Sequence, residues 1–70
     1  MNTGRANDAI AAFRYGIQVA PDEDILYLNL SRTLLRTGER EKARDVMRQL
    51  LDRKPGNALA LGALRELEVP

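Results

Sequence analysis

Apolar side chains recur every three or four residues in four stretches of this 70-residue chain, a spacing that places them on one face of an α-helix. We predict helices over residues 5–20, 23–37, 39–53 and 58–68. The first helix has an apolar stripe of Ala9, Ile10, Phe13, Ile17 and Ala20. The stripe of the second helix is Leu26, Tyr27, Leu30, Leu34 and Leu35, and that of the third is Ala43, Val46, Met47, Leu50 and Leu51. No stretch alternates apolar and polar residues with a period of two, so the predicted fold class is all-α.

Proline, glycine and short polar residues mark the turns between these helices. Pro21 ends the first helix, because proline cannot continue the hydrogen-bond ladder and restricts the residue before it. Asp22 is the expected N-cap of the second helix, with two further acids behind it at the positive end of the helix. Gly38 stands where a left-handed C-cap is required, and Asn57 is suited to cap the fourth helix.

The helical pattern repeats with a period of 34 residues, the distance between Pro21 and Pro55. At the same offset Thr3-Gly4 matches Thr37-Gly38, Ala9 matches Ala43, Arg14 matches Arg48, and Leu30 matches Leu64. These identities fall at a turn, at a helix breaker and in the apolar stripe. They therefore indicate a repeated helix–turn–helix unit, and both Gly4 and Gly38 are expected in turns.

Residues 24–57 carry large and small side chains at fixed spacing. The residues concerned are Tyr27, Leu30, Ser31, Leu34, Ala43, Met47 and Pro55. This pattern resembles the tetratricopeptide repeat, a helix–turn–helix unit of 34 residues. The preceding segment keeps the second half of the same signature as Ala9, Phe13 and Pro21. Small residues such as Ser31 are expected where two helix axes approach most closely.

The resemblance implies a fragment of a right-handed α-α superhelix built from antiparallel helical hairpins, four helices in all. Residues 1–70 would form one domain, made of a second-helix half-repeat (1–23), one complete repeat (24–57) and a first-helix half-repeat (58–70). In the last half-repeat Arg65 occupies the small-residue position and Glu68 an aromatic position. This departure is expected of a terminal, capping-like helix.

The resemblance also implies a protein–protein interaction module, because the concave face of such arrays, lined by the first helix of each repeat, binds a peptide or protein segment. The expected contact residues are Ile25, Leu28, Asn29, Arg32, Leu35, Arg36, Leu59 and Glu66, with Gly62 and Ala63 extending the surface. Leu28 and Leu35 would give apolar contacts, and the two arginines would meet a carboxylate. Alternatively, the leucines pack against adjacent helices and the arginines are only solvated. Binding of the acidic C-terminal tails of chaperones, as in some members of the family, is not expected. Ile25, Leu28 and Ala63 stand at positions where that binding requires basic residues.

A second hypothesis, from a different class, is self-assembly into a homo-oligomer through the exposed ends of the array. One hairpin cannot bury its apolar face alone, so its neighbours must stack, and an uncovered end exposes an apolar patch. Tyr15 lies off the apolar stripe of its helix. It suits either a contact for a preceding helix or a partly buried aromatic at the rim.

The composition argues against several kinds of chemistry. The chain has no Cys and no His, which excludes a Cys/His zinc site and a His-dependent nucleophile. We therefore expect neither an enzyme nor a cofactor. The acid run Asp22-Glu23-Asp24 suits a helix N-terminus and lacks the alternating ligands of a calcium loop.

Neither nucleic acid nor a membrane is an expected partner. The net charge is only +1, which gives little attraction to polyanions, and no run approaches the roughly 18 apolar residues of a membrane span. A stripe of arginines on the third helix could bind phosphate, but ion pairs along the same helix are favoured. These pairs would join Glu41 to Arg44, Asp45 to Arg48, and Arg48 to Asp52. The first five residues lack the apolar core of a signal peptide, so a cytoplasmic location is expected.

Overall fold

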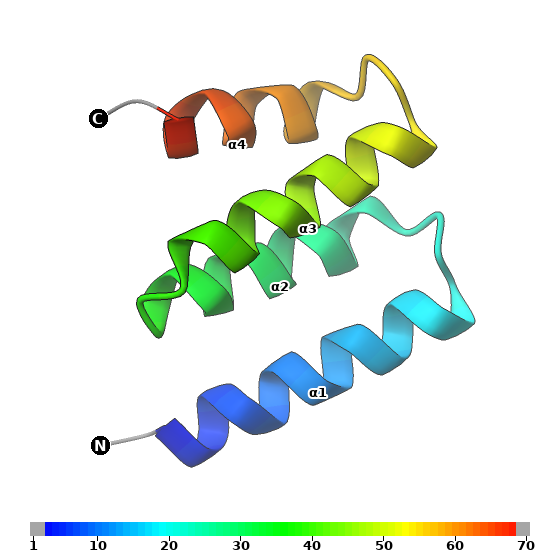
Figure 1. The fold of residues 1–70 in the computed structure, drawn as a ribbon. Coiled ribbons are helices and arrows are strands. Elements are labelled where there is room, and N and C mark those ends of the chain that lie inside the picture. The colour runs from blue at the N-terminus through cyan, green and yellow to red at the C-terminus, as the bar shows by residue number, and fades with distance from the viewer. Residues whose placement is uncertain (1–2, 69–70) are drawn as a thin grey trace.

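Four α-helices make up most of the computed structural model, which describes residues 3–68. They are α1 (Thr3–Val19), α2 (Asp24–Arg36), α3 (Arg40–Arg53) and α4 (Ala58–Glu68). The helices follow one another in a row, with α1 and α4 on the outside (Figure 1). The prediction of an all-α fold with four helices is confirmed, and no strand occurs within the described range. The outermost residues of the two predicted half-repeats, 1–2 and 69–70, lie outside it.

The turn between α2 and α3 is closed by Gly38, which has a φ of +83°. Its N–H donates to Leu35 O over 3.0 Å, and the Glu39 N–H donates to Leu34 O over 2.8 Å. This is the Schellman arrangement, in which a residue in the left-handed region satisfies the last carbonyls of a helix. Glycine adopts that conformation without a Cβ clash, so the C-cap prediction is confirmed. The prediction of a turn at Gly4 is wrong, because that residue lies inside α1.

The starts of α4 and α2 are capped differently. Asn57 Oδ1 accepts a hydrogen bond from the Ala60 N–H over 3.0 Å, which confirms Asn57 as the N-cap of α4. The prediction for Asp22 is wrong, because Glu23 occupies the N-cap position of α2 and makes no side-chain capping bond. The Glu23 N–H donates to Ala20 O over 3.2 Å, so the turn takes one more residue before the helix begins.

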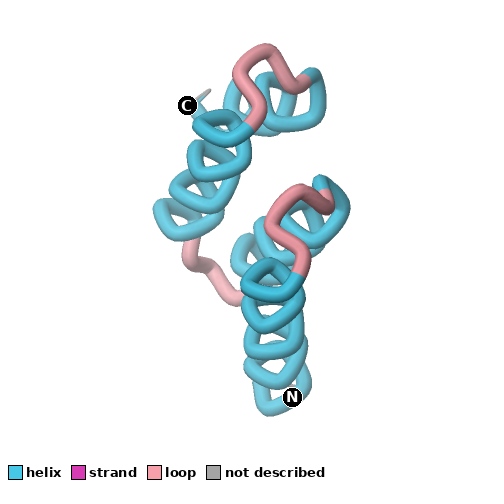
Figure 2. The backbone as a smooth tube through the Cα atoms, turned by 90° about the vertical axis from the view of Figure 1, so that its right-hand side faces the viewer, coloured by secondary structure: helices cyan, strands magenta, loops and turns pink. Residues whose placement is uncertain are grey.

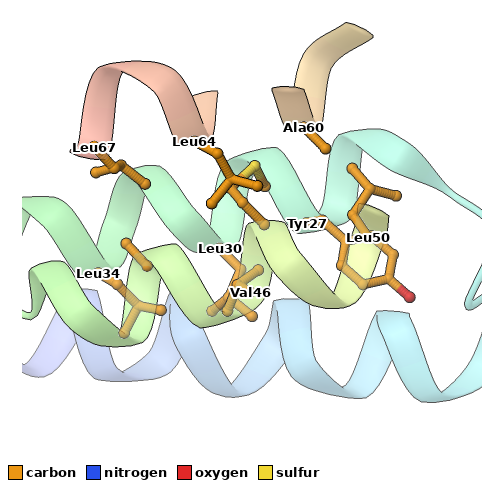
Figure 3. Close-up of a cluster of buried hydrophobic side chains, with 10 residues drawn as sticks. Tyr27, Leu30, Leu34, Val46, Leu50, Ala60, Leu64 and Leu67 are labelled. Carbon is orange, nitrogen blue, oxygen red and sulfur yellow. The ribbon is translucent and has the colours of Figure 1, made fainter. Parts of the chain in front are cut away.

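The hydrophobic core lies between α2, α3 and α4 (Figure 3). The buried apolar residues are Tyr27, Leu30, Leu34, Ala43, Val46, Met47, Leu50, Ala60, Leu64 and Leu67. Side chains of α1 pack against this cluster and stay partly exposed, chiefly Ile10, Phe13 and Ile17. The hydroxyl of Tyr27 donates to Pro21 O over 2.6 Å. The largest core side chain therefore has its polar atom satisfied, as burial requires.

Antiparallel packing places the α1–α2 and α3–α4 loops along one side of the row, at one end of the helices, and the α2–α3 loop along the opposite side (Figures 1 and 2). The Cα atoms span 36 × 33 × 13 Å, so the molecule is a flat slab. No other described helix covers the outer flanks of α1 and α4. None of the four helices in the described part of the chain is long and apolar enough to cross a membrane.

Candidate functional site

A groove of about 440 Å³ runs between α2 and α4. Its walls are formed by Leu28, Ser31, Arg32, Leu35, Arg40, Ala58, Leu59, Gly62, Ala63, Glu66 and Leu67. The two helices are one 34-residue period apart, so Leu28 and Gly62 occupy equivalent positions on opposite walls. A Cβ added to Gly62 would meet no atom within 4 Å. The missing side chain of Gly62 therefore leaves open space on the α4 wall.

Five of the eight residues predicted to contact a partner line this groove, namely Leu28, Arg32, Leu35, Leu59 and Glu66. Leu35 and Leu59 are 40% and 46% exposed, which is apolar surface that the fold itself does not bury. The prediction that Leu35 belongs to the buried stripe of α2 is wrong, because its side chain points into this groove instead of the core.

A second hollow of about 430 Å³ lies between α1 and α2. It is lined by Phe13, Asn29, Arg32, Thr33, Leu35 and Arg36. Arg32 and Leu35 belong to both hollows, so they form the ridge between them. The predicted residues Asn29 and Arg36 lie on this side of the ridge. Ile25 is 52% exposed and lines neither hollow, because the groove starts one helical turn later, at Leu28.

The two walls of the groove carry opposite charges. Arg32 is exposed on the α2 wall and Glu66 on the α4 wall, while Arg36 is exposed on α2 beside the second hollow. Within residues 3–68 no salt bridge engages any of these three side chains. The α2 wall can therefore meet a carboxylate, while Glu66 can meet a cation.

One end of the groove is closed by a contact between α3 and α4. Arg40 stands at the start of α3, and its Nη2 donates to Leu67 O over 2.6 Å and to Glu66 O over 3.4 Å. Those carbonyls belong to the last turn of α4, where a cation also opposes the negative end of the helix dipole. Arg40 therefore holds the C-terminal end of α4 in place beside the groove.

The other end is held by a cluster of polar side chains around Asp24, the first residue of α2. Lys54 Nζ donates to Asp24 Oδ1 over 2.7 Å and to Asp22 O over 2.8 Å. Asn57, which caps α4, donates from Nδ2 to Asp24 Oδ2 over 2.8 Å. The hydrogen bond from Lys54 lowers the pKa of Asp24, with a further contribution from Asn57, and it raises the pKa of Lys54. The cluster ties the start of α2 to the turn before α4, so both ends of the groove are fixed.

Two arginines of α3, Arg40 and Arg48, contact α4, and Arg48 does not form the pairs that the sequence suggested. Arg48 Nη2 lies 3.2 Å from Glu68 Oε2 of α4, and not against Asp45 or Asp52 of its own helix. Arg40, which belongs to the arginine stripe of this helix, lines the groove. The rule that pairs charges three or four residues apart considers only one helix and not the helix packed against it. The contacts of Arg40 and Arg48 with α4 were therefore not predicted.

The groove-lining residues Ser31, Ala58 and Leu67 were also not predicted as contacts. Ser31 and Leu67 are nearly buried, so they form the floor and offer little surface to a partner. The alternation of buried and exposed positions along each helix could have identified them as floor residues.

Neither hollow contains a reactive or metal-binding cluster. Among the described residues, no three Asp, Glu, Cys or His side chains are close enough to hold a metal ion. The groove offers apolar side chains and flanking charges, between helices that are joined by hydrogen bonds at both ends. These properties suit non-covalent recognition of an extended or helical segment.

Comparison with known proteins gives a single match. The family model described as the tetratricopeptide repeat matches residues 2–67. Neither a curated protein nor a solved structure matches the chain significantly. The match covers all four helices except Glu68, the last residue of α4, and it includes both walls of the groove.

Proposed function

Because the chain belongs to the tetratricopeptide repeat family, we propose that it binds a segment of another protein in the groove between α2 and α4. Members of this family generally act as protein–protein interaction modules and are typically not catalytic. The proposal assigns that general role to a particular surface of this chain.

The observation that carries the proposal is the set of half-buried and exposed leucines that line the groove. Leu28, Leu35 and Leu59 line about 440 Å³ of open space, and apolar area removed from water contributes roughly 25 cal/mol per Å². A groove of this size accepts one or two large side chains. The surrounding segment would then make the polar contacts at the rim.

The charges on the walls favour one polarity of ligand. A carboxylate next to the apolar anchor would meet Arg32 on α2, since arginine binds a carboxylate through paired donors. A basic residue on the opposite side would meet Glu66 on α4. We therefore propose a ligand with an apolar anchor, an acidic residue toward α2 and a basic or neutral residue toward α4.

Selection from a library of random short peptides, followed by measurement of Kd by fluorescence anisotropy, tests this proposal. Gly62→Phe should abolish binding by filling the groove, because the added side chain extends into open space and leaves the core intact. Gly62→Ala, which adds only a methyl group at the same place, is the matched control and should bind normally. Selected peptides that bind Gly62→Phe as tightly as the natural chain would contradict the proposal.

The charge preference has its own test. Arg32→Glu should raise the Kd of an acidic peptide by about tenfold or more, since a hydrogen bond to a charged group is worth roughly 1.5–3 kcal/mol. A version of the peptide with Lys in place of the acid should recover binding to the variant. If both peptides bind Arg32→Glu equally, the proposed polarity is incorrect.

A further inference from the structure

A larger hollow, which the peptide groove does not use, lies between α3 and α4 and includes part of the outer flank of α4. Its volume is about 710 Å³, and it is lined by Arg48, Leu51, Asp52, Leu61, Leu64, Arg65 and Glu68. Leu61 is 48% exposed there. On the outer flank of α1, at the other end of the row, Tyr15 and Val19 are 68% and 67% exposed. Both flanks therefore present apolar side chains that no described helix covers.

Residues 34 positions apart have equivalent places in the repeat, so the contact between α2 and α3 can be compared with the uncovered flanks of α4 and α1. Tyr27 has in α2 the position that Leu61 has in α4, yet it is only 2% exposed, because α2 and α3 pack together there. Val46 has in α3 the position of Ala12 in α1. Val46 is 3% exposed, whereas Ala12 is exposed. The contact between α2 and α3 thus buries the positions that Leu61 and Ala12 leave open, whereas the equivalents of Tyr15 and Val19 in α3, Gln49 and Arg53, stay exposed.

We propose that α1 of a second copy of this chain packs on the outer flank of α4, in the register that α3 takes on α2. The contact is head to tail, because it joins two different surfaces, and the copies form an open chain in place of a closed dimer. It gives the self-assembly hypothesis a defined interface. It is independent of the proposed peptide binding, since the groove between α2 and α4 stays open.

Side-chain sizes on the two surfaces are complementary. Arg65 has on α4 the position of the small residue Ser31 on α2, so a helix as bulky as α3 would fit poorly. The corresponding face of α1 is slimmer, with Ala12 where α3 has Val46. Ala9 keeps the small side chain of Ala43. The smaller docking helix leaves room for the aliphatic stem of Arg65, whose charged end can reach water.

Charges are complementary at one end of the proposed contact. Within the chain, the Glu39 N–H donates to Leu34 O over 2.8 Å, so these two positions are adjacent. Their equivalents in the assembly are Arg5 of the second copy and Glu68 of the first. The Glu68 side chain is 47% exposed beside its bridge to Arg48, so it has surface free to accept a second cation.

The other end of the contact is apolar. Within the chain, Arg53 Nη2 lies 3.4 Å from Asp22 Oδ1, so these positions are also adjacent. Their equivalents in the assembly are Val19 of the second copy and Gly56 of the first, next to Pro55. Val19, which is 67% exposed, would therefore lie beside the turn that precedes α4, at a position whose equivalent Arg53 stays partly exposed inside the chain.

Sedimentation velocity of the 70-residue chain over a range of concentrations tests this interface, together with two variants. Ala12→Arg blocks the α1 flank and Leu61→Arg blocks the α4 flank, and both positions are exposed, so the fold is retained. The natural chain should grow beyond a dimer as concentration rises, while each variant alone should stay near 7.8 kDa. Mixing the two variants should give a dimer that grows no further, because each still carries the flank that the other lacks.

The mixing step makes the test decisive. A heterodimer shows that both variants are folded and that the contact joins two different surfaces. A natural chain that stays monomeric at every concentration would overturn the proposal, and so would variants that associate alone or fail to pair when mixed. Gly62→Phe, which fills the peptide groove, should assemble like the natural chain. Failure of peptide binding and failure of assembly are therefore distinguishable.

Discussion

A Cβ atom added to Gly16 would lie 3.1 Å from Leu26 Cδ1, so α1 and α2 meet with a glycine directly against a leucine. One period later the sizes are exchanged, because Leu50 has the position of Gly16 and Ala60 has the position of Leu26. Both residues of the second pair are completely buried, and Figure 3 shows them between α3 and α4. Each pair thus combines one leucine with one small residue, Gly16 in the first pair and Ala60 in the second. The leucine lies on the second helix of the first pair, α2, and on the first helix of the second pair, α3.

This exchange predicts that Gly16→Leu destabilises the chain and that Leu26→Ala then compensates. Overpacking should lower the free energy of unfolding by about 1–3 kcal/mol, and the double variant should recover most of that loss because it copies the Leu50–Ala60 pair. Urea denaturation of the natural chain, both single variants and the double variant gives the coupling energy. Gly62→Ala is the control for helix propensity, since a Cβ there meets nothing within 4 Å. Additive effects would show that the two residues do not share one space.

The buried hydroxyl of Tyr27 gives a second prediction. Tyr27→Phe removes the 2.6 Å hydrogen bond to Pro21 O and should lower the free energy of unfolding by about 1 kcal/mol. Tyr15→Phe is the matched control, because Tyr15 is 68% exposed and an exposed substitution usually stays within about 0.5 kcal/mol. Equal effects of the two changes in thermal denaturation would mean that the bond to Pro21 does not stabilise the fold.

The repeat pattern predicted the positions of the elements well, and the reason is physical. The buried stripe, the C-cap at Gly38 and the N-cap at Asn57 depend on interactions within one helix or one turn. Those interactions can be inferred from spacing alone. The N-cap of α2 was predicted one residue too early because the turn at 20–23 uses a backbone hydrogen bond that spacing does not specify.

Contacts between helices were much less predictable. Arg40 and Arg48 find their partners on α4, 20 to 27 residues away, and the angle between the helices decides which groups they reach. The sequence likewise gave no indication that Asp24, Lys54 and Asn57 meet at the end of the groove. The predicted contact residues form two hollows separated by a ridge at Arg32, and that division depends on how α1 and α4 flank α2.

The cluster at Asp24 predicts how stability varies with pH. The pKa of Asp24 is lowered below 3.8 by Lys54 and Asn57, so its contribution is present above that value and is lost as pH falls through the lowered pKa. The pKa of Lys54 is raised above 10.5, so its contribution is complete below 10.5 and is lost as pH rises through the raised pKa. Stability should therefore decline at both extremes.

Asp24→Asn should flatten both declines, because it removes the charge that shifts both groups. Urea denaturation between strongly acid and strongly alkaline pH measures the effect. Asp52→Asn is the charge-matched control, since no salt bridge in the described part of the chain includes Asp52. Some acid dependence should remain in Asp24→Asn, because the hydrogen bond from Lys42 also lowers the pKa of Glu39. An unchanged pH profile would contradict the assigned role of the cluster.

The most direct test of peptide binding in the groove is chemical-shift mapping by NMR, with a selected peptide titrated into the labelled chain at a concentration where it is monomeric. The account predicts that the largest shifts occur at Leu28, Arg32, Leu35, Leu59, Gly62 and Glu66, and that Tyr15 and Leu61 on the outer flanks stay unchanged. Shifts concentrated on the outer flanks, with the groove residues unaffected, would contradict it.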